Sequence, residues 1–312
     1  MPPTSEPPTS EPQPTEPQRW VDTADGLRLP VWERGDPAAP TVLLVHGYPD
    51  DHAVWDGVAD VLAERFHVVA HDVRGAGRAG VPARRSGFRL DRLAEDLRRV
   101  ADAVAPGRPV HLVAHDWGAI QTWHAVTDPR ADDRFASFTS ISGPCLDHAG
   151  RWIRDKLRHP TPAGLRALLT QLVRSGYIGF FQLPALPELA WRSGALPRLL
   201  RALERPDRRA AARPARPALA DGVRGLALYR ENIRPRSGAR PPRRTGLPVQ
   251  VLAPVGDPFV SAPVQTEIEP WVPDLRISRV PGGHWLPRSR PALVAEHAAE
   301  LIDHVETHRP AK

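Results

Sequence analysis

Cysteine and long apolar runs are almost missing from this chain of 312 residues. Cys145 is the only cysteine, so an intramolecular disulfide is impossible and nothing points to an oxidising compartment. No segment approaches the ~18 consecutive apolar residues that a membrane span needs. The N-terminus also lacks the apolar stretch of a signal peptide. The sequence therefore predicts a cytoplasmic protein without a membrane span.

Lysine is equally scarce, occurring only at Lys156 and Lys312, so arginine supplies nearly all of the positive charge behind the formal net value of +6. Arginine-rich runs at 198–216 and 234–244 contain no aromatic residues, and no nucleic-acid-binding motif accompanies them. We therefore expect no nucleic-acid partner.

Metal and nucleotide motifs are missing or incomplete. The cysteine is single and no His-Glu-x-x-His run occurs, so we expect no metal site. The glycines between Gly75 and Gly80 match the dinucleotide pattern G-x-G-x-x-G, but Pro82 argues against the helix that this pattern requires. We expect no cofactor.

Proline is concentrated in the first nineteen residues, where the unit Pro-Pro-Thr-Ser-Glu occurs twice in tandem. Proline blocks helix and ladder hydrogen bonds, and no large apolar residue other than Met1 could offset the entropy of ordering. We predict that residues 1–19 form a disordered tail.

After the tail, apolar runs of strand length alternate with longer helical patterns, as in a mostly parallel sheet covered by helices on both faces. An early antiparallel strand is expected at 27–33, after an Asp-Gly turn. Buried strands are expected at 41–45, 67–71, 110–114 and 135–142, and further strands at 249–255 and 275–280. Helices are expected at 52–65, 91–105, 117–127 and 291–307.

The alternation stops between residues 144 and 245, where the pattern is helical and no clear strand occurs. An insert at this point would lie over the carboxyl ends of the strands, where ligands bind in such sheets. We therefore predict an α/β core formed by residues 20–143 and 246–312, with residues 144–245 as a helical cap.

Asp116 lies in a sharp turn between the expected 110–114 strand and 117–127 helix. Ala114 and Gly118, two residues before and after it, are small, as in a nucleophile elbow, where the turn is strained and backbones pass close together. Asp116 thus occupies the position that serine holds in esterases. The alternative is that Asp116 only caps the following helix.

Three further elements follow expected strands. In His46-Gly47-Tyr48-Pro49, the backbone N–H of Tyr48 would form an oxyanion hole with that of Trp117. Asp257 and His284 each stand just beyond a later strand, giving the order nucleophile, acid, histidine. Asp274 is a competing acid, but it precedes a strand and so belongs at the opposite end of the sheet. These elements together favour catalysis over a helix cap.

A carboxylate nucleophile restricts the chemistry. An ionised carboxylate attacks without prior removal of a proton, whereas serine needs a base. Attack on an ordinary ester would give a more reactive anhydride, whereas attack on an sp³ carbon gives a stable ester. The expected substrate is therefore an epoxide or an alkyl halide. His284, oriented by Asp257, would then activate water to hydrolyse the ester, with the oxyanion hole acting in that step.

Two of the three tyrosines, Tyr177 and Tyr229, fall in the expected cap. A protonated phenol can donate to an epoxide oxygen, whereas a departing halide calls for N–H donors. The alternative is that both tyrosines only pack within the helices, so the residues alone leave epoxide and halide open.

Taken together, five motifs resemble the soluble epoxide hydrolases of the α/β-hydrolase superfamily: His46-Gly47-Tyr48-Pro49, His115-Asp116-Trp117-Gly118, Tyr177 before Phe181-Gln182, Tyr229-Arg230 and Gly283-His284-Trp285. The resemblance covers the chain after the tail. It implies an eight-stranded, mostly parallel sheet with an inserted cap. It also implies Asp116 as nucleophile, Asp257 and His284 as the water-activating pair, and two epoxide-oxygen donors, Tyr177 and Tyr229.

The same resemblance implies a small-molecule epoxide as substrate. The residues expected to contact this substrate are His46, Pro49, Phe181 and Trp285. Phe180, Trp152 and Trp191 are further candidates for lining the pocket. Ala114 departs from the family's usual glycine, and the arginine- and proline-rich stretch 201–216 leaves the shape of the cap open.

More closely, the segments 140–148 and 180–184 resemble actinobacterial proteins in which such a hydrolase precedes a short-chain dehydrogenase domain. We expect no such second domain here, because the sequence ends after the expected closing helix. A separate dehydrogenase is therefore a possible partner, and we expect a monomer or a homodimer.

Two alternatives to an epoxide hydrolase stay open. One is a haloalkane dehalogenase, although Tyr48 replaces an asparagine that often binds halide in that family, and the two cap tyrosines would have no role. The other is a non-catalytic binding domain that recruits a dehydrogenase.

Overall fold

The computed structural model describes residues 16–129, 134–204, 218–233 and 243–308. Within these residues, eight strands form one sheet in the order β1-β2-β4-β3-β5-β6-β7-β8. β2 is antiparallel to its neighbours β1 and β4, and the remaining pairs are parallel. The prediction of an eight-stranded, mostly parallel sheet is confirmed. The strands are β1 (Arg19–Asp22), β2 (Arg28–Arg34), β3 (Thr41–Val45), β4 (His67–His71), β5 (Val110–His115), β6 (Phe135–Ile141), β7 (Val249–Pro254) and β8 (Leu275–Val280).

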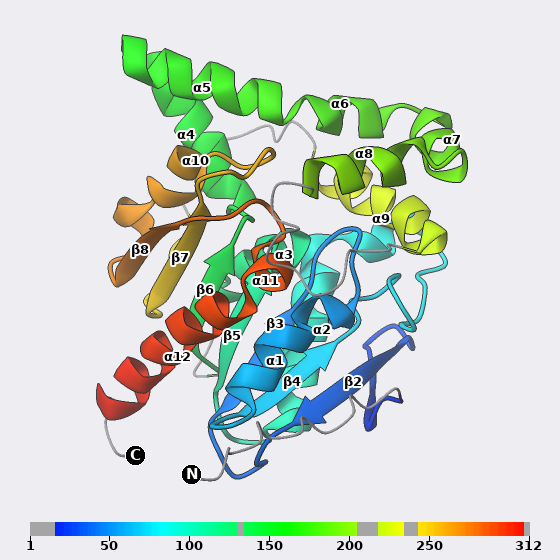
Figure 1. Ribbon diagram of the computed structural model, residues 1–312, viewed down its shortest axis with the longest axis vertical. Helices are drawn as coiled ribbons and strands as arrows, with labels where there is room; N and C mark the ends of the chain where they lie inside the picture. The colour runs from blue at the N-terminus through cyan, green and yellow to red at the C-terminus, as the bar shows by residue number, and fades with distance from the viewer. Residues whose placement is uncertain (1–15, 130–133, 205–217, 234–242, 309–312) are drawn as a thin grey trace, which may run out of the picture.

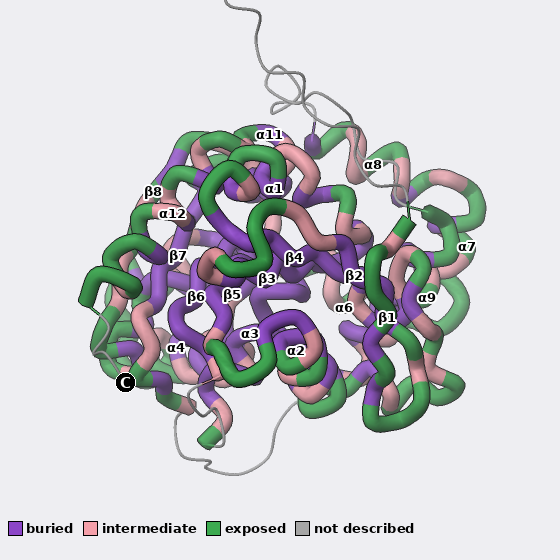
Figure 2. Tube along the Cα trace, turned by 90° about the horizontal axis from the view of Figure 1, so that it is seen from below, coloured by how far each residue is buried: buried purple, intermediate pink, exposed green. Residues whose placement is uncertain are grey.

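The central strands are buried throughout because helices cover both faces of the sheet. Helices α2 (Leu90–Val104) and α3 (Trp117–Val126) pack on one face, and α1 (Asp56–Leu62) and α12 (Pro291–His308) pack on the other. Successive strand residues alternate between these two cores, as Leu43 and Leu44 do on β3. Figure 2 shows the buried strands enclosed by helices whose outer sides are exposed.

Between β6 and β7 the described residues form only helices. They are α4 (Leu146–Arg158), α5 (Pro162–Arg174), α6 (Gly176–Gln182), α7 (Leu186–Arg192), α8 (Ala195–Glu204) and α9 (Leu219–Asn232), and we call them the helical insert. Figure 1 shows the insert across one end of the molecule, with the sheet below it. Asp116 follows β5 at this end, so the insert lies over the carboxyl ends of the strands.

Two local expectations differ from the structure. The expected tail reaches into the first strand, because Gln18 donates its N–H to the carbonyl of Val31 and β1 begins at Arg19. This edge strand has only two apolar residues, so it gives little pattern to detect. The expected 52–65 helix is instead a 3₁₀ turn, η1 (His52–Trp55), followed by the short α1. Residues 1–15 lie outside the described residues.

Four short elements connect the larger ones. They are η2 (Arg85–Phe88), α10 (Ala262–Thr266), η4 (Glu269–Trp271) and α11 (Leu286–Ser289). The glycine-rich loop at 75–80 is followed by η2 only at Arg85, so no helix begins within it. None of the helices in the described residues is long and apolar enough to cross a membrane.

Candidate active site

Asp116 occupies a strained turn between β5 and α3, with φ 53° and ψ −124°. A non-glycine residue rarely adopts a positive φ, and such strain persists only where surrounding structure enforces it. Gly118 shows the crowding, since a Cβ atom at that position would stand 2.2 Å from the carbonyl oxygen of Val45. The Asp116 side chain makes no capping hydrogen bond to α3. The interpretation that Asp116 only caps the following helix is therefore wrong, because its carboxylate does not bind the N-terminus of α3.

One carboxylate oxygen of Asp116 is held by a backbone donor. The N–H of Tyr48, from the loop after β3, donates to Oδ1 of Asp116 at 2.7 Å. Trp117 brings its own backbone nitrogen to the same place: a Cβ atom on Gly47 would meet Oδ1 of Asp116 at 2.5 Å and the Trp117 nitrogen at 2.6 Å. The structure thus brings together both backbone groups that the sequence predicts for an oxyanion hole.

His284 and Asp257 form a hydrogen-bonded pair from the loops after β8 and β7. Nδ1 of His284 lies 3.0 Å from Oδ2 of Asp257. The other oxygen of Asp257 accepts the N–H groups of Phe259 and Val260 at 2.8 and 3.0 Å. Burial alone would raise the pKa of Asp257, but His284 and these donors lower it. The competing acid Asp274 stands before β8, at the opposite end of that strand.

The second imidazole nitrogen of His284, Nε2, lies 3.5 Å from Oδ2 of Asp116. Burial alone would lower the pKa of His284, but the negative charges of Asp257 and Asp116 outweigh it and raise the pKa to about 10. His284 therefore carries a proton at neutral pH.

His115, the residue before Asp116, holds the backbone of His284 in place. Its Nε2 lies 2.8 Å from the carbonyl oxygen of His284, a hydrogen bond that fixes the His284 backbone. Burial, followed by the charge of His284, lowers the pKa of His115 to about 4. His115 is therefore neutral at ordinary pH, as expected for a residue that supports the turn.

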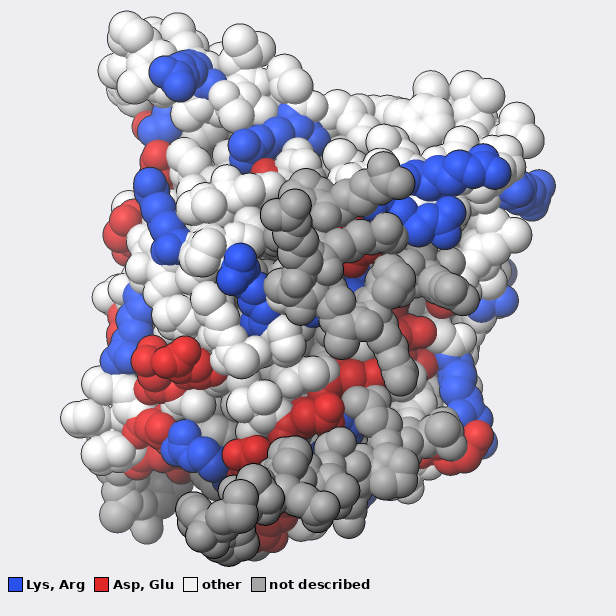
Figure 3. All heavy atoms as spheres, viewed as in Figure 1, with Lys and Arg blue, Asp and Glu red and all other residues white. Residues whose placement is uncertain are grey.

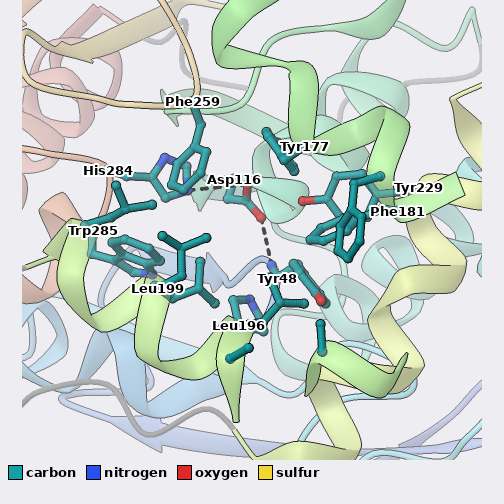
Figure 4. Close-up of a pocket in the computed structure, with 16 residues that line it drawn as sticks. Tyr48, Asp116, Tyr177, Phe181, Leu196, Leu199, Tyr229, Phe259, His284 and Trp285 are labelled. Carbon is teal, nitrogen blue, oxygen red and sulfur yellow. Dashed lines mark hydrogen bonds and ion pairs between the residues drawn. The ribbon is translucent and has the colours of Figure 1, made fainter. Parts of the chain in front are cut away.

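Tyr177 on α6 and Tyr229 on α9 line the same cavity as Asp116, with ring centroids 5.8 Å apart. Figure 4 shows Asp116 between His284 on one side and the two tyrosines on the other. Burial and the negative charge of Asp116 raise the pKa of Tyr177. Burial, Tyr177 and Asp116 likewise raise the pKa of Tyr229. Both hydroxyls are therefore protonated at neutral pH.

The Tyr48 side chain joins the core to the helical insert. Its hydroxyl donates to the carbonyl oxygen of Gly222 on α9 at 2.8 Å and accepts the indole N–H of Trp191 on α7 at 2.7 Å. Trp191 is therefore a support for Tyr48 and not a residue of the cavity wall. Trp152 also lies away from the cavity and donates to Glu267.

The cavity above Asp116 has a volume of about 380 Å³. Among the residues predicted to contact substrate, Pro49, Phe181 and Trp285 line it, as does Phe180. His46 does not line it, because its Nε2 accepts the N–H of Val73 at 2.9 Å and so holds the neighbouring loop. The remaining wall is apolar. It is formed by Ala190, Ala195, Leu196, Leu199, Leu200, Leu203 and Phe259.

The α8 side of this wall was not predicted, although the sequence carries a signal for it. Leu196, Leu199, Leu200 and Leu203 follow the i, i+3, i+4, i+7 spacing of one helical face. All four line the cavity. The spacing identifies an apolar face but not what the face covers, so the role of α8 becomes clear only from the fold.

A buried ion cluster ties the end of α8 to the core. Arg288 lies 2.6 Å from Asp50 and 2.6 Å from Glu204, the last residue of α8. Asp50 also accepts the indole N–H of Trp285 at 3.0 Å. The cluster therefore fixes both the α8 side and the Trp285 side of the cavity. In the part of the chain that the structure describes, no three side chains are grouped to hold a metal ion.

Comparisons with known proteins identify the family of this chain. Residues 40–287 match the family model described as alpha/beta hydrolase fold. The Probable oxidoreductase EphD of Mycobacterium tuberculosis is 35% identical over 94% of this chain and 51% of its own length. This chain thus spans about half the length of that relative. Epoxide hydrolase A of the same organism is 39% identical over 42% of this chain and 40% of its own length.

Among solved structures, an epoxide hydrolase of Bacillus megaterium in complex with an inhibitor is similar in fold. Its TM-score is 0.75 over 91% of this chain and 100% of that chain, at 21% sequence identity. The family model covers most of the chain, from β3 to the start of α11. The chain therefore belongs to the alpha/beta hydrolase fold family.

Proposed function

We propose that this chain hydrolyses epoxides to vicinal diols through an ester formed on Asp116. One observation carries the proposal: a carboxylate in the elbow position faces two protonated tyrosine hydroxyls on one side and a His–Asp pair on the other. The similarity to proteins named as epoxide hydrolases supports the same substrate class.

In the first step, Oδ2 of Asp116 attacks a carbon of the epoxide ring. A carbon–oxygen bond forms to the carboxylate as the ring carbon–oxygen bond breaks, and Tyr177 or Tyr229 donates a proton to the departing oxygen. Oδ1 of Asp116 is occupied by the Tyr48 N–H, so the attacking atom is Oδ2, which lies 3.5 Å from Nε2 of His284. The product of this step is a hydroxyalkyl ester of Asp116.

Ester formation removes the charge of Asp116, and His284 then gives its proton to the tyrosinate left by the first step. In the second step, the neutral His284 removes a proton from water, and the resulting hydroxide attacks the ester carbonyl carbon. Oδ1 then carries the developing negative charge, which the N–H groups of Tyr48 and Trp117 stabilise. Collapse of this intermediate breaks the ester bond, releases the diol and restores the Asp116 carboxylate. The departing alkoxide takes the proton of the added hydroxyl. His284 keeps the proton taken from water, which restores its starting state.

The polar groups of the cavity favour an epoxide over an alkyl halide. An epoxide oxygen leaves as an alkoxide and needs a proton, which the buried hydroxyls of Tyr177 and Tyr229 can supply. A halide needs donors but no proton. The backbone N–H of Tyr48, a candidate halide donor, is already bound to Asp116.

The test is diol release from a panel of apolar epoxides, followed by a single turnover in heavy-oxygen water with enzyme in excess. We expect diol formation and incorporation of the label into Asp116, measured by mass spectrometry of the peptide that contains it. Label enters the aspartate only if water attacks its carbonyl carbon.

Two controls separate the alternatives. The Asp116→Asn variant should release no diol and take up no label. Halide release from alkyl halides without diol from any epoxide would replace the proposal with a dehalogenase. Inactivity of the native chain on both substrate classes would favour a binding role, such as recruitment of a dehydrogenase.

A further inference from the structure

Helix α5 is apolar on two sides, and only one of them packs against the protein. Gly164, Leu168 and Gln171 are buried, and Gln171 bonds the backbone of Phe259 and Ser261 in the loop after β7. On the other side, Leu165, Leu169, Leu172 and Val173 form a stripe at helical spacing, and Leu169 and Val173 are 63% and 73% exposed. A helix that is apolar all round is normally covered.

A second group of exposed apolar residues follows α6 in the insert. Leu183, Leu186 and Leu189 are also exposed, and Leu189 reaches 60%. Pro187 and Trp191 of α7 are buried against the protein, so Leu186 and Leu189 of the same helix point outward. We call the seven exposed apolar residues of 165–189 the outer face. Large apolar side chains exposed along one edge of the molecule mark an interaction site.

The charge around the outer face is of one sign. The segment 162–204 contains Arg166, Arg174, Arg192, Arg198 and Arg201, and its only acids are Glu188 and Glu204. Both acids are ion-paired with arginines outside the segment, Arg230 and Arg288. Figure 3 shows the upper edge, over α5 to α7, as uncharged surface with basic groups, while most acidic groups lie lower on the core.

We propose that the outer face docks on a lipid surface with anionic headgroups. Apolar helix faces flanked by arginine bind at such interfaces, the side chains entering the headgroup region and the guanidinium groups meeting lipid phosphates. A second copy of this chain fits less well, because a two-fold contact would set the same arginines against each other. This inference concerns binding and goes beyond the proposed hydrolysis.

Helix α8 connects the proposed docking surface with the cavity. Leu199 and Leu203 line the cavity and are also 53% and 36% exposed, and α8 contacts α7. α8 therefore joins the cavity wall to α7, which carries part of the outer face.

The test is flotation of the native full chain with two kinds of vesicle, phosphatidylcholine alone and phosphatidylcholine mixed with phosphatidylglycerol. We expect binding to the mixed vesicles that weakens with added salt. The variant carrying Leu169→Asp and Leu172→Asp should bind at least about tenfold less. A matched control is Val61→Asp, an exposed apolar position on α1 (42% exposed), which should bind like the native chain.

Circular dichroism and thermal melting show whether each variant is folded, so the result does not depend on any hydrolase activity. Replacing Arg166 and Arg192 with glutamine should reduce the difference between the two kinds of vesicle. No flotation at low salt, or equal flotation of the L169D/L172D variant, would overturn the proposal. A dimer that this variant dissociates, with no vesicle binding by the native chain, would identify the outer face as a self-interface instead.

Discussion

Nε2 of His284 lies 3.5 Å from Oδ2 of Asp116, so one imidazole stands between two buried carboxylates, Asp116 and Asp257. This position accounts for the raised pKa of His284, about 10. A protonated imidazole cannot accept a proton from water. Under the proposed mechanism, ester formation removes the charge of Asp116, which lowers the pKa of His284. The histidine would thus become a base only after the first step is complete.

Replacing Asp116 with asparagine tests this coupling. The variant keeps the shape of the carboxylate and removes its charge, and asparagine tolerates the positive φ of this turn. We expect the pKa of His284 to fall by at least about one unit, measured by nuclear magnetic resonance of the imidazole across pH. Asp303→Asn, at an exposed pair with Arg65, is the control and should leave the His284 titration unchanged. An unaltered titration in the Asp116→Asn variant would contradict the coupling.

The same histidine predicts how stability depends on pH. Its pKa is raised from 6.5 to about 10, so the folded state holds this proton more tightly than the unfolded chain. The resulting stabilisation is complete below pH 6.5 and is lost as pH rises through about 10. We expect the Tm advantage of the native chain over a His284→Gln variant to shrink between pH 7 and pH 10. An advantage that stays constant or grows over this range, in melts of both proteins, would count against the assigned direction.

Much of the candidate site could be predicted because parallel strands end at one edge of the sheet. Asp116, Asp257 and His284 follow β5, β7 and β8, and the carboxyl ends of these strands lie close together, although the residues are up to 168 positions apart in the chain. Strands β3, β4 and β8 also have the predicted bounds. β3 and β4 are buried and mostly apolar runs, which makes them easy to recognise. β8 is partly exposed and contains two arginines.

The rest depends on tertiary packing that spacing does not encode. The partners in the Arg288 cluster, Asp50 and Glu204, are 238 and 84 positions away, and neither stands in a recognisable motif. His46 belongs to the predicted His-Gly-Tyr-Pro motif, but its ring turns toward Val73 and away from the cavity. A sequence pattern gives the residue, whereas the side-chain direction follows from its neighbours.

The two cap tyrosines give a prediction that separates proton donation from packing. Tyr177→Phe and Tyr229→Phe each remove only a hydroxyl, so kcat/KM for an epoxide should fall by about 10²-fold if these hydroxyls donate to the ring oxygen. Tyr48→Phe is the matched control. Its hydroxyl bonds Gly222 and Trp191, so we expect a loss of about 1 kcal/mol in stability with little change in kcat. Equal losses of kcat in all three variants would point to packing as the common cause.

The ion pair between Arg288 and Glu204 predicts a link between stability and substrate binding. Both side chains are largely buried, at 13% and 4% exposed, and breaking a buried pair costs about 3 kcal/mol or more. Glu204→Gln should therefore lower the free energy of unfolding by about this amount and, by loosening α8, raise KM for an apolar epoxide more than it lowers kcat. Asp303→Asn is the control. Its pair with Arg65 is exposed, at 50% and 54%, and neither residue lines the cavity, so a loss below about 1 kcal/mol with unchanged KM is expected. Denaturant titration and steady-state kinetics of both variants check the contrast, and similar KM values for the two would show that α8 does not depend on the Arg288 cluster.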